Sequence, residues 1–127
     1  MKVICADANL FALIKLRKQM REILPQADVY GCLSPKDVKK LAGRIGCDVL
    51  LTDIDFGFRK GEGLRLAQEM KCLYPRVNII LATSGSLQDY AMHIIKLRIS
   101  GFLIKPYTNE ELKEEIMNLR YAEVSNT

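Results

Sequence analysis

Polar residues of the kinds that handle phosphoryl groups follow several short apolar runs of the chain. They are Asp7 after Val3–Ala6, Asp53 after Asp48–Thr52, Thr83 after Val77–Ala82 and Lys105 after Gly101–Ile104. Carboxylates bind a divalent cation or act as a nucleophile, while a hydroxyl and an ammonium group bind phosphoryl oxygens. One such residue alone is more typical of a turn or a helix cap. The combination favours a phosphoryl-transfer site.

The apolar runs alternate with stretches of helical period, as strands and helices do in α/β proteins. The runs that predict strands are those four and Ala27–Tyr30, and helical patterns follow at Leu10–Ile23, from Ser34, at Gly61–Cys72, from Ser86 to about Leu97, and from Thr108 to about Arg120. Strict alternation predicts a parallel sheet with helices on both faces. Because parallel strands end at one edge of the sheet, the polar residues above should converge there.

Capping signals set the expected helix starts. A serine or threonine is followed three residues later by an acid at Ser34, Ser86 and Thr108, which is a capping-box pattern. We expect one domain over residues 1–121, with residues 122–127 a frayed tail or the start of a linker.

Composition excludes several other classes of protein. No apolar run is long enough for a membrane span and no signal peptide begins the sequence, so we expect a soluble, cytoplasmic protein without membrane contact. The cysteines lack the spacing of a zinc site. The formal charge of +4 is spread over helical patterns, which argues against direct nucleic-acid contact by this segment. His93, the single histidine, falls inside a helical pattern and is predicted to be a surface or partly buried helix residue without a catalytic role.

Because Asp7, Asp53, Thr83 and Lys105 follow its strands, the chain resembles the receiver domains of two-component response regulators over essentially its whole length. The resemblance implies a (βα)5 flavodoxin-like fold, a five-stranded doubly wound parallel sheet with strand order 2-1-3-4-5. It also implies that Asp53 is the phosphoacceptor and that Lys105 contacts the phosphoryl group. The metal ligands would be Asp7, Asp53 and the backbone carbonyl of Asp55. Thr83 would be the switch hydroxyl and Phe102 the switch aromatic.

The same resemblance implies partners and a mode of action. A sensor histidine kinase would donate the phosphoryl group, and the chain would not be an enzyme beyond slow autodephosphorylation. A homodimer through the fourth helix, fifth strand and fifth helix is possible. The segment from Ser100 to Tyr121 is similar to receivers that precede a DNA-binding output domain, which implies a role in transcription regulation.

Two departures from the family pattern affect the site. Ala8 stands where the family has a second acid, so we expect weak Mg²⁺ binding. The loop Phe56–Gly63 is about two residues longer than the family loop.

Two alternatives remain open. The chain could be a pseudo-receiver, an interaction module without efficient phosphorylation, which Ala8 favours. More remotely, Asp53-Ile54-Asp55 resembles the Asp-x-Asp motif of phosphatases that form an aspartyl phosphate.

Overall fold

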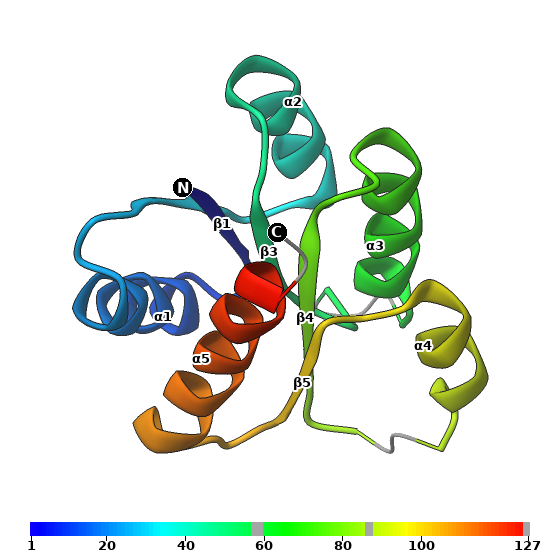
Figure 1. The fold of residues 1–127 in the computed structure, drawn as a ribbon. Helices are drawn as coiled ribbons and strands as arrows, with labels where there is room; N and C mark the ends of the chain where they lie inside the picture. Colours follow the sequence, from blue (N-terminus) through cyan, green and yellow to red (C-terminus); the bar gives the residue numbers. More distant parts are fainter. Residues whose placement is uncertain (57–59, 86–87, 126–127) are drawn as a thin grey trace.

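A computed structural model describes residues 1–56, 60–85 and 88–125 of the chain, without the side chains of residues 120–125. Strands and helices alternate throughout (Figure 1). The strands are β1 Lys2–Ala6, β2 Asp28–Cys32, β3 Val49–Asp53, β4 Asn78–Thr83 and β5 Gly101–Ile104. The helices are α1 Leu10–Ile23, α2 Pro35–Ile45, α3 Glu62–Leu73, α4 Ala91–Leu97 and α5 Asn109–Ser125.

The strands form one parallel sheet in the order β2-β1-β3-β4-β5. This confirms the predicted fold class and strand order. The central strands β1, β3 and β4 are buried on both faces, which explains why their sequences are apolar runs instead of alternating patterns.

Helices cover both faces of the sheet and enclose two cores (Figure 1). Helices α1 and α5 pack on one face, over residues such as Cys5, Leu51 and Leu103. Helices α2, α3 and α4 lie on the other face, over residues such as Ile4 and Leu81. In the part of the chain that the structure describes, no helix is long and apolar enough to cross a membrane.

Two helix boundaries differ by several residues from those predicted, whereas α3 is shifted by only one residue. The capping pattern at Ser86 predicted the start of the fourth helix, but α4 starts at Ala91 and Tyr90 is its N-cap residue. Ser86 itself lies outside the described residues. The fifth helix continues to Ser125, past the predicted end near Arg120, so helical structure enters the segment that we expected to be a frayed tail or linker.

Candidate phosphoryl-acceptor site

The pairing of the strands brings the predicted site residues together at one edge of the sheet. Ala6 is paired with Thr52, so the next residues, Asp7 and Asp53, are neighbours. Thr83 is paired with Ile104 at the ends of β4 and β5, and the backbone N–H of Lys105 donates to the carbonyl oxygen of Thr83 at 2.8 Å. The parallel sheet therefore positions all of these side chains, as the sequence predicted.

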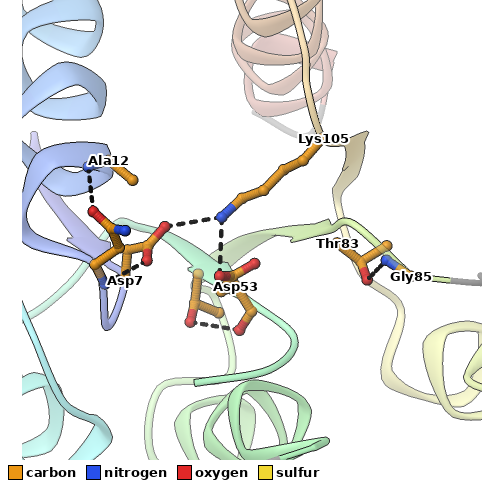
Figure 2. Close-up of polar contacts among 8 residues, drawn as sticks. Asp7, Ala12, Asp53, Thr83, Gly85 and Lys105 are labelled. Atoms are coloured by element: carbon orange, nitrogen blue, oxygen red, sulfur yellow. Dashed lines mark hydrogen bonds and ion pairs between the residues drawn. The ribbon is translucent and has the colours of Figure 1, made fainter. Parts of the chain in front are cut away.

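The ammonium group of Lys105 joins the two aspartates (Figure 2). Its Nζ lies 2.9 Å from Oδ2 of Asp7 and 2.9 Å from Oδ2 of Asp53. The aspartate side chains are 8% and 16% exposed and that of Lys105 is 27% exposed. A largely desolvated cation thus holds two carboxylates at the edge of the sheet, where the site opens to solvent.

Burial and charge act in opposite directions on the ionisation of this group of residues. Burial raises the pKa of Asp53 above its ordinary value, as do the neighbouring carboxylates, and the bond from Lys105 only partly offsets this. Burial alone would lower the pKa of Lys105, but its bonds to Asp53 and Asp7 outweigh burial and raise that pKa. Lys105 is therefore a permanent cation at neutral pH.

Asp53 is held in place by its buried neighbours on the chain. Thr52 is fully buried and its hydroxyl donates to the carbonyl oxygen of Asp53 at 3.0 Å. Ile54 is also fully buried, and its carbonyl oxygen accepts from the N–H of Gly63 at the start of α3. The backbone on either side of the carboxylate is thereby fixed by β3 and α3.

Asp7 is oriented by the turn that starts α1. The backbone N–H of Asn9 donates to Oδ1 of Asp7 at 2.8 Å, and Oδ1 of Asn9 accepts from the N–H of Ala12 as the N-cap of the helix. Only Oδ2 of Asp7 is thus directed to Lys105. Asn9 was not among the predicted site residues, although an asparagine just before a helical pattern is a recognisable N-cap signal.

Thr83 and Phe102 occupy different surroundings in this structure. Thr83 is buried, and its hydroxyl oxygen accepts from the backbone N–H of Gly85 at 3.0 Å, which directs it toward the β4–α4 connection (Figure 2). Phe102 is half-buried on β5 and, like Ile94 and Leu97 of α4, packs against the α2–α3–α4 core. The two residues thus lie on the strands nearest to α4.

An open hollow of about 480 Å³ lies over Asp7, Asp53 and Lys105 and is large enough for a phosphoryl group with its ligands. It is lined by Asp7, Ala8, Asn9, Ala12, Asp53, Asp55, Ser84 and Lys105. Ala8 is exposed and lines the hollow, at the position where the family pattern has a second acid.

The carboxylates of Asp7 and Asp53, which both contact the ammonium of Lys105, are also a suitable donor set for Mg²⁺. This ion uses one or two protein carboxylates together with water and phosphate oxygens. Among the residues described, no cluster of three or more His, Cys, Asp or Glu side chains is arranged to hold a metal ion. The site therefore fits a cation that depends on phosphoryl and water oxygens.

Asp55 turns its carboxylate to the neighbouring loops. Its Oδ1 accepts from the N–H of Gly61 at 2.5 Å and from the hydroxyl of Tyr90 at 3.2 Å. Desolvation and the Asp55 carboxylate raise the pKa of Tyr90, so its hydroxyl remains a donor. Residues 57–59 of the long loop lie outside the described residues.

The site also depends on Gly63, which was not among the predicted site residues. A Cβ atom at this position would lie 1.6 Å from the carbonyl oxygen of Asp53. Only glycine lets α3 start this close to the end of β3. Its signal in the sequence, one glycine among several near a helix start, is too weak to single it out. His93 is exposed on α4, as predicted.

Comparison with known proteins agrees with this geometry. The family model of the response regulator receiver domain matches residues 3–117. The chain therefore belongs to the receiver domain family of two-component response regulators. A comparison with curated proteins found no match.

Solved structures with this fold share little sequence with the chain. A response regulator receiver domain protein from Clostridium thermocellum is 20% identical, with a TM-score of 0.85 over 99% of this chain and 98% of that one. RcsB from Salmonella enterica serovar Typhimurium, bound to promoter rprA in the presence of the phosphomimetic BeF3⁻, is 22% identical, with a TM-score of 0.81 over 94% of this chain and 98% of that one. A further Salmonella typhimurium RcsB structure is 22% identical, with a TM-score of 0.82, and matches 96% of this chain but 60% of its own length.

Proposed function

We propose that this chain accepts a phosphoryl group on Asp53 from a phosphohistidine of a sensor histidine kinase. The observation that carries the proposal is the contact of one ammonium group, that of Lys105, with the carboxylates of both Asp53 and Asp7 at 2.9 Å. This arrangement provides a nucleophile, a cation for the transferred group and a second carboxylate beneath one open hollow.

The chemistry follows from these positions. A carboxylate oxygen of Asp53 forms a bond to phosphorus while the bond from phosphorus to the donor imidazole nitrogen breaks. The product carries more negative charge than the carboxylate did, and the ammonium of Lys105 is already in place to neutralise it. The chain acts as a phosphoacceptor with slow autodephosphorylation, not as an enzyme with an external substrate.

Mg²⁺ is the cation that we propose for this site, held by Asp7, Asp53 and the backbone carbonyl of Asp55. When bound, it supplies further positive charge to the transferred oxygens. Because Ala8 offers no ligand, we expect weak affinity, with half-saturation in the range of about 10⁻⁴–10⁻³ M or higher.

The surface beside the hollow suits a protein donor. Leu10, Phe11 and Ile14 are exposed apolar residues at the start of α1, and Phe11 is 82% exposed. The neighbouring residues Asn9 and Ala12 line the hollow. We propose that the kinase docks its phosphohistidine-bearing surface here, because apolar contacts this close to the site would deliver the donor to Asp53.

The output surface that we propose consists of α4, β5 and α5. A phosphoryl group on Asp53 would draw the hydroxyl of Thr83 toward it and away from Gly85, and Phe102 could then repack beside α4. The result would be a homodimer, or the release of a DNA-binding output domain that controls transcription. The receiver itself would not touch nucleic acid or membrane, and it would work in the cytoplasm.

Intact-mass measurement after treatment with acetyl phosphate and Mg²⁺ tests the proposal. The wild type should gain one phosphoryl group and Asp53→Asn should gain none. Asp48→Asn is the matched control, because it removes an exposed carboxylate that directly precedes the same strand, at the end away from Asp53. A phosphoryl group that persists in Asp53→Asn would refute the assignment of Asp53. A wild type that gains none would favour the pseudo-receiver. Continued turnover of a phosphomonoester would favour the phosphatase.

A further inference from the structure

The carboxylate of Asp55 connects two loops that border the site. Its Oδ1 accepts from the backbone N–H of Gly61, which is the N-cap of α3, and from the hydroxyl of Tyr90, which is the N-cap of α4. The contact between Asp55 and Tyr90 thus joins the β3–α3 loop to the start of α4.

The same carboxylate borders the hollow over the phosphoacceptor. Asp55 lines it together with Asp7, Asp53 and Lys105. A cation that enters there attracts every nearby carboxylate, and Ala8 supplies none. The side chain of Asp55 therefore has two competing sets of partners: the donors on Gly61 and Tyr90, or the charges that occupy the hollow.

The position of helix α4 on the core depends strongly on the residue at its N-terminus. It is seven residues long and none of its side chains is fully buried, and among the described residues its N-cap residue makes no side-chain capping hydrogen bond. The first backbone bond of the helix runs from the N–H of Ile94 to the carbonyl oxygen of Tyr90. Tyr90, Ile94 and Leu97 together pack against the α2–α3–α4 core. A shift of Tyr90 therefore changes how α4 lies on the core.

We propose that the contact between Asp55 and Tyr90 is a latch that couples occupancy of the site to α4, in addition to the route through Thr83 and Phe102. This inference rests on the proposed function, since it names how the same site is regulated. In the absence of Mg²⁺ and a phosphoryl group, the contact with Asp55 would hold Tyr90 and the start of α4. Occupancy by Mg²⁺ and a phosphoryl group draws the carboxylate inward and frees Tyr90. Tyr90 is a positioning residue that acts through Asp55 and touches no reacting atom.

The test uses Tyr90→Phe, which removes the hydroxyl and keeps the ring. Because Asp55 then loses a competing donor, the variant should bind Mg²⁺ about three- to tenfold more tightly, the factor expected for one hydrogen bond. Methyl signals of Ile94 and Ile95, measured by NMR without ligand, should move toward the positions that the wild type reaches with Mg²⁺ and beryllofluoride. Tyr74→Phe is the control, because Tyr74 lies at the opposite end of α3, and it should change neither readout.

The outcomes separate this inference from the proposed function. If the wild type shows no bound beryllofluoride by ¹⁹F NMR, the proposed function and the latch both fail. If beryllofluoride binds but Tyr90→Phe leaves the Mg²⁺ affinity and the Ile94 signal as in the wild type, the latch alone is wrong. A tighter site with displaced α4 signals in Tyr90→Phe only, and not in Tyr74→Phe, supports it.

Discussion

Ala8 is the residue at which a single substitution should change the site most directly. It is exposed, lines the hollow and is adjacent to Asp7. We expect Ala8→Asp to tighten Mg²⁺ binding about tenfold or more, because a further carboxylate adds charge and a ligand to a site otherwise dependent on Asp7 and Asp53. Titration followed by NMR or calorimetry measures this.

Ala8→Asn is the matched control, since it has nearly the same shape as the aspartate but no charge. It should leave the affinity within a factor of about two or three of the wild type. Micromolar affinity in the unmodified chain would contradict the expectation, because it would mean that another ligand already replaces the missing acid.

At the scale of single residues, the sequence predicted the members of the site but not all of their contacts. Asp7, Asp53, Thr83 and Lys105 could be placed because each ends or directly follows a strand, and parallel strands end together. The contact between Asp55 and Tyr90 could not be predicted, because it joins two loops whose paths no periodic pattern determines.

At the scale of elements, the close approach of α3 to β3 predicts that a methyl group added at Gly63 lowers the stability of the protein. Gly63→Ala should destabilise the protein by about 2–3 kcal/mol or more, because a Cβ 1.6 Å from the carbonyl oxygen of Asp53 forces the backbone of one element to move. Urea denaturation followed by circular dichroism measures the change.

Gly43→Ala is the control for Gly63→Ala. Gly43 lies inside α2, and a Cβ there meets nothing within 4 Å. Alanine should therefore stabilise α2 by about 0.5–1 kcal/mol. Equal effects at the two glycines would show that helix propensity, and not the contact with Asp53, decides the cost at Gly63.

The predicted elements agree with the structure where burial imposes the pattern and differ where it does not. Strands β3 and β4 are apolar because both faces are covered, so their sequences identify them. Helix α4 buries no side chain, and the capping pattern near Ser86 placed its start too early. A local signal with little tertiary packing to support it gives the existence of such a helix more reliably than its boundary.

For the whole molecule, the ionisation of Asp53 predicts how stability depends on pH. Burial, with Asp7 and Asp55, raises the pKa of Asp53 in the folded state, so the folded protein binds that proton more readily than the unfolded chain. The free energy of unfolding should therefore fall as pH rises from about 3.9, the ordinary value for an aspartate, through the raised pKa.

Asp53→Asn removes this unfavourable ionisation. Its Tm at pH 7 should exceed that of the wild type, and the difference should shrink as pH approaches about 4. Asp48→Asn should show no such gain, because Asp48 accepts a hydrogen bond from the backbone N–H of Lys2. A lower Tm in Asp53→Asn would show that its bond to Lys105 outweighs burial.

Self-association should depend on the exposed apolar residues of the output surface. Met92, Ile95 and Ile104 are all more than half exposed on α4 and β5. If phosphorylation forms a dimer there, Ile95→Lys should weaken it at least about tenfold, because burying an unpaired ammonium is costly. Sedimentation with beryllofluoride and Mg²⁺ measures this. Leu73→Lys, at an exposed position on α3, should leave the dimer unchanged, and equal weakening by both variants would locate the interface elsewhere.

The weak packing of α4 also predicts which part of the molecule unfolds locally most readily. Because none of its side chains is buried, its backbone amides should exchange with deuterated solvent through a local opening that leaves the sheet intact. Amides of β1, β3 and β4 lie in the buried centre of the sheet and should exchange only when the whole domain unfolds. A short deuterium pulse should therefore label Ile94–Leu97 long before Leu50 or Leu81. Equal protection of α4 and the central strands would show that α4 is held as firmly as the sheet.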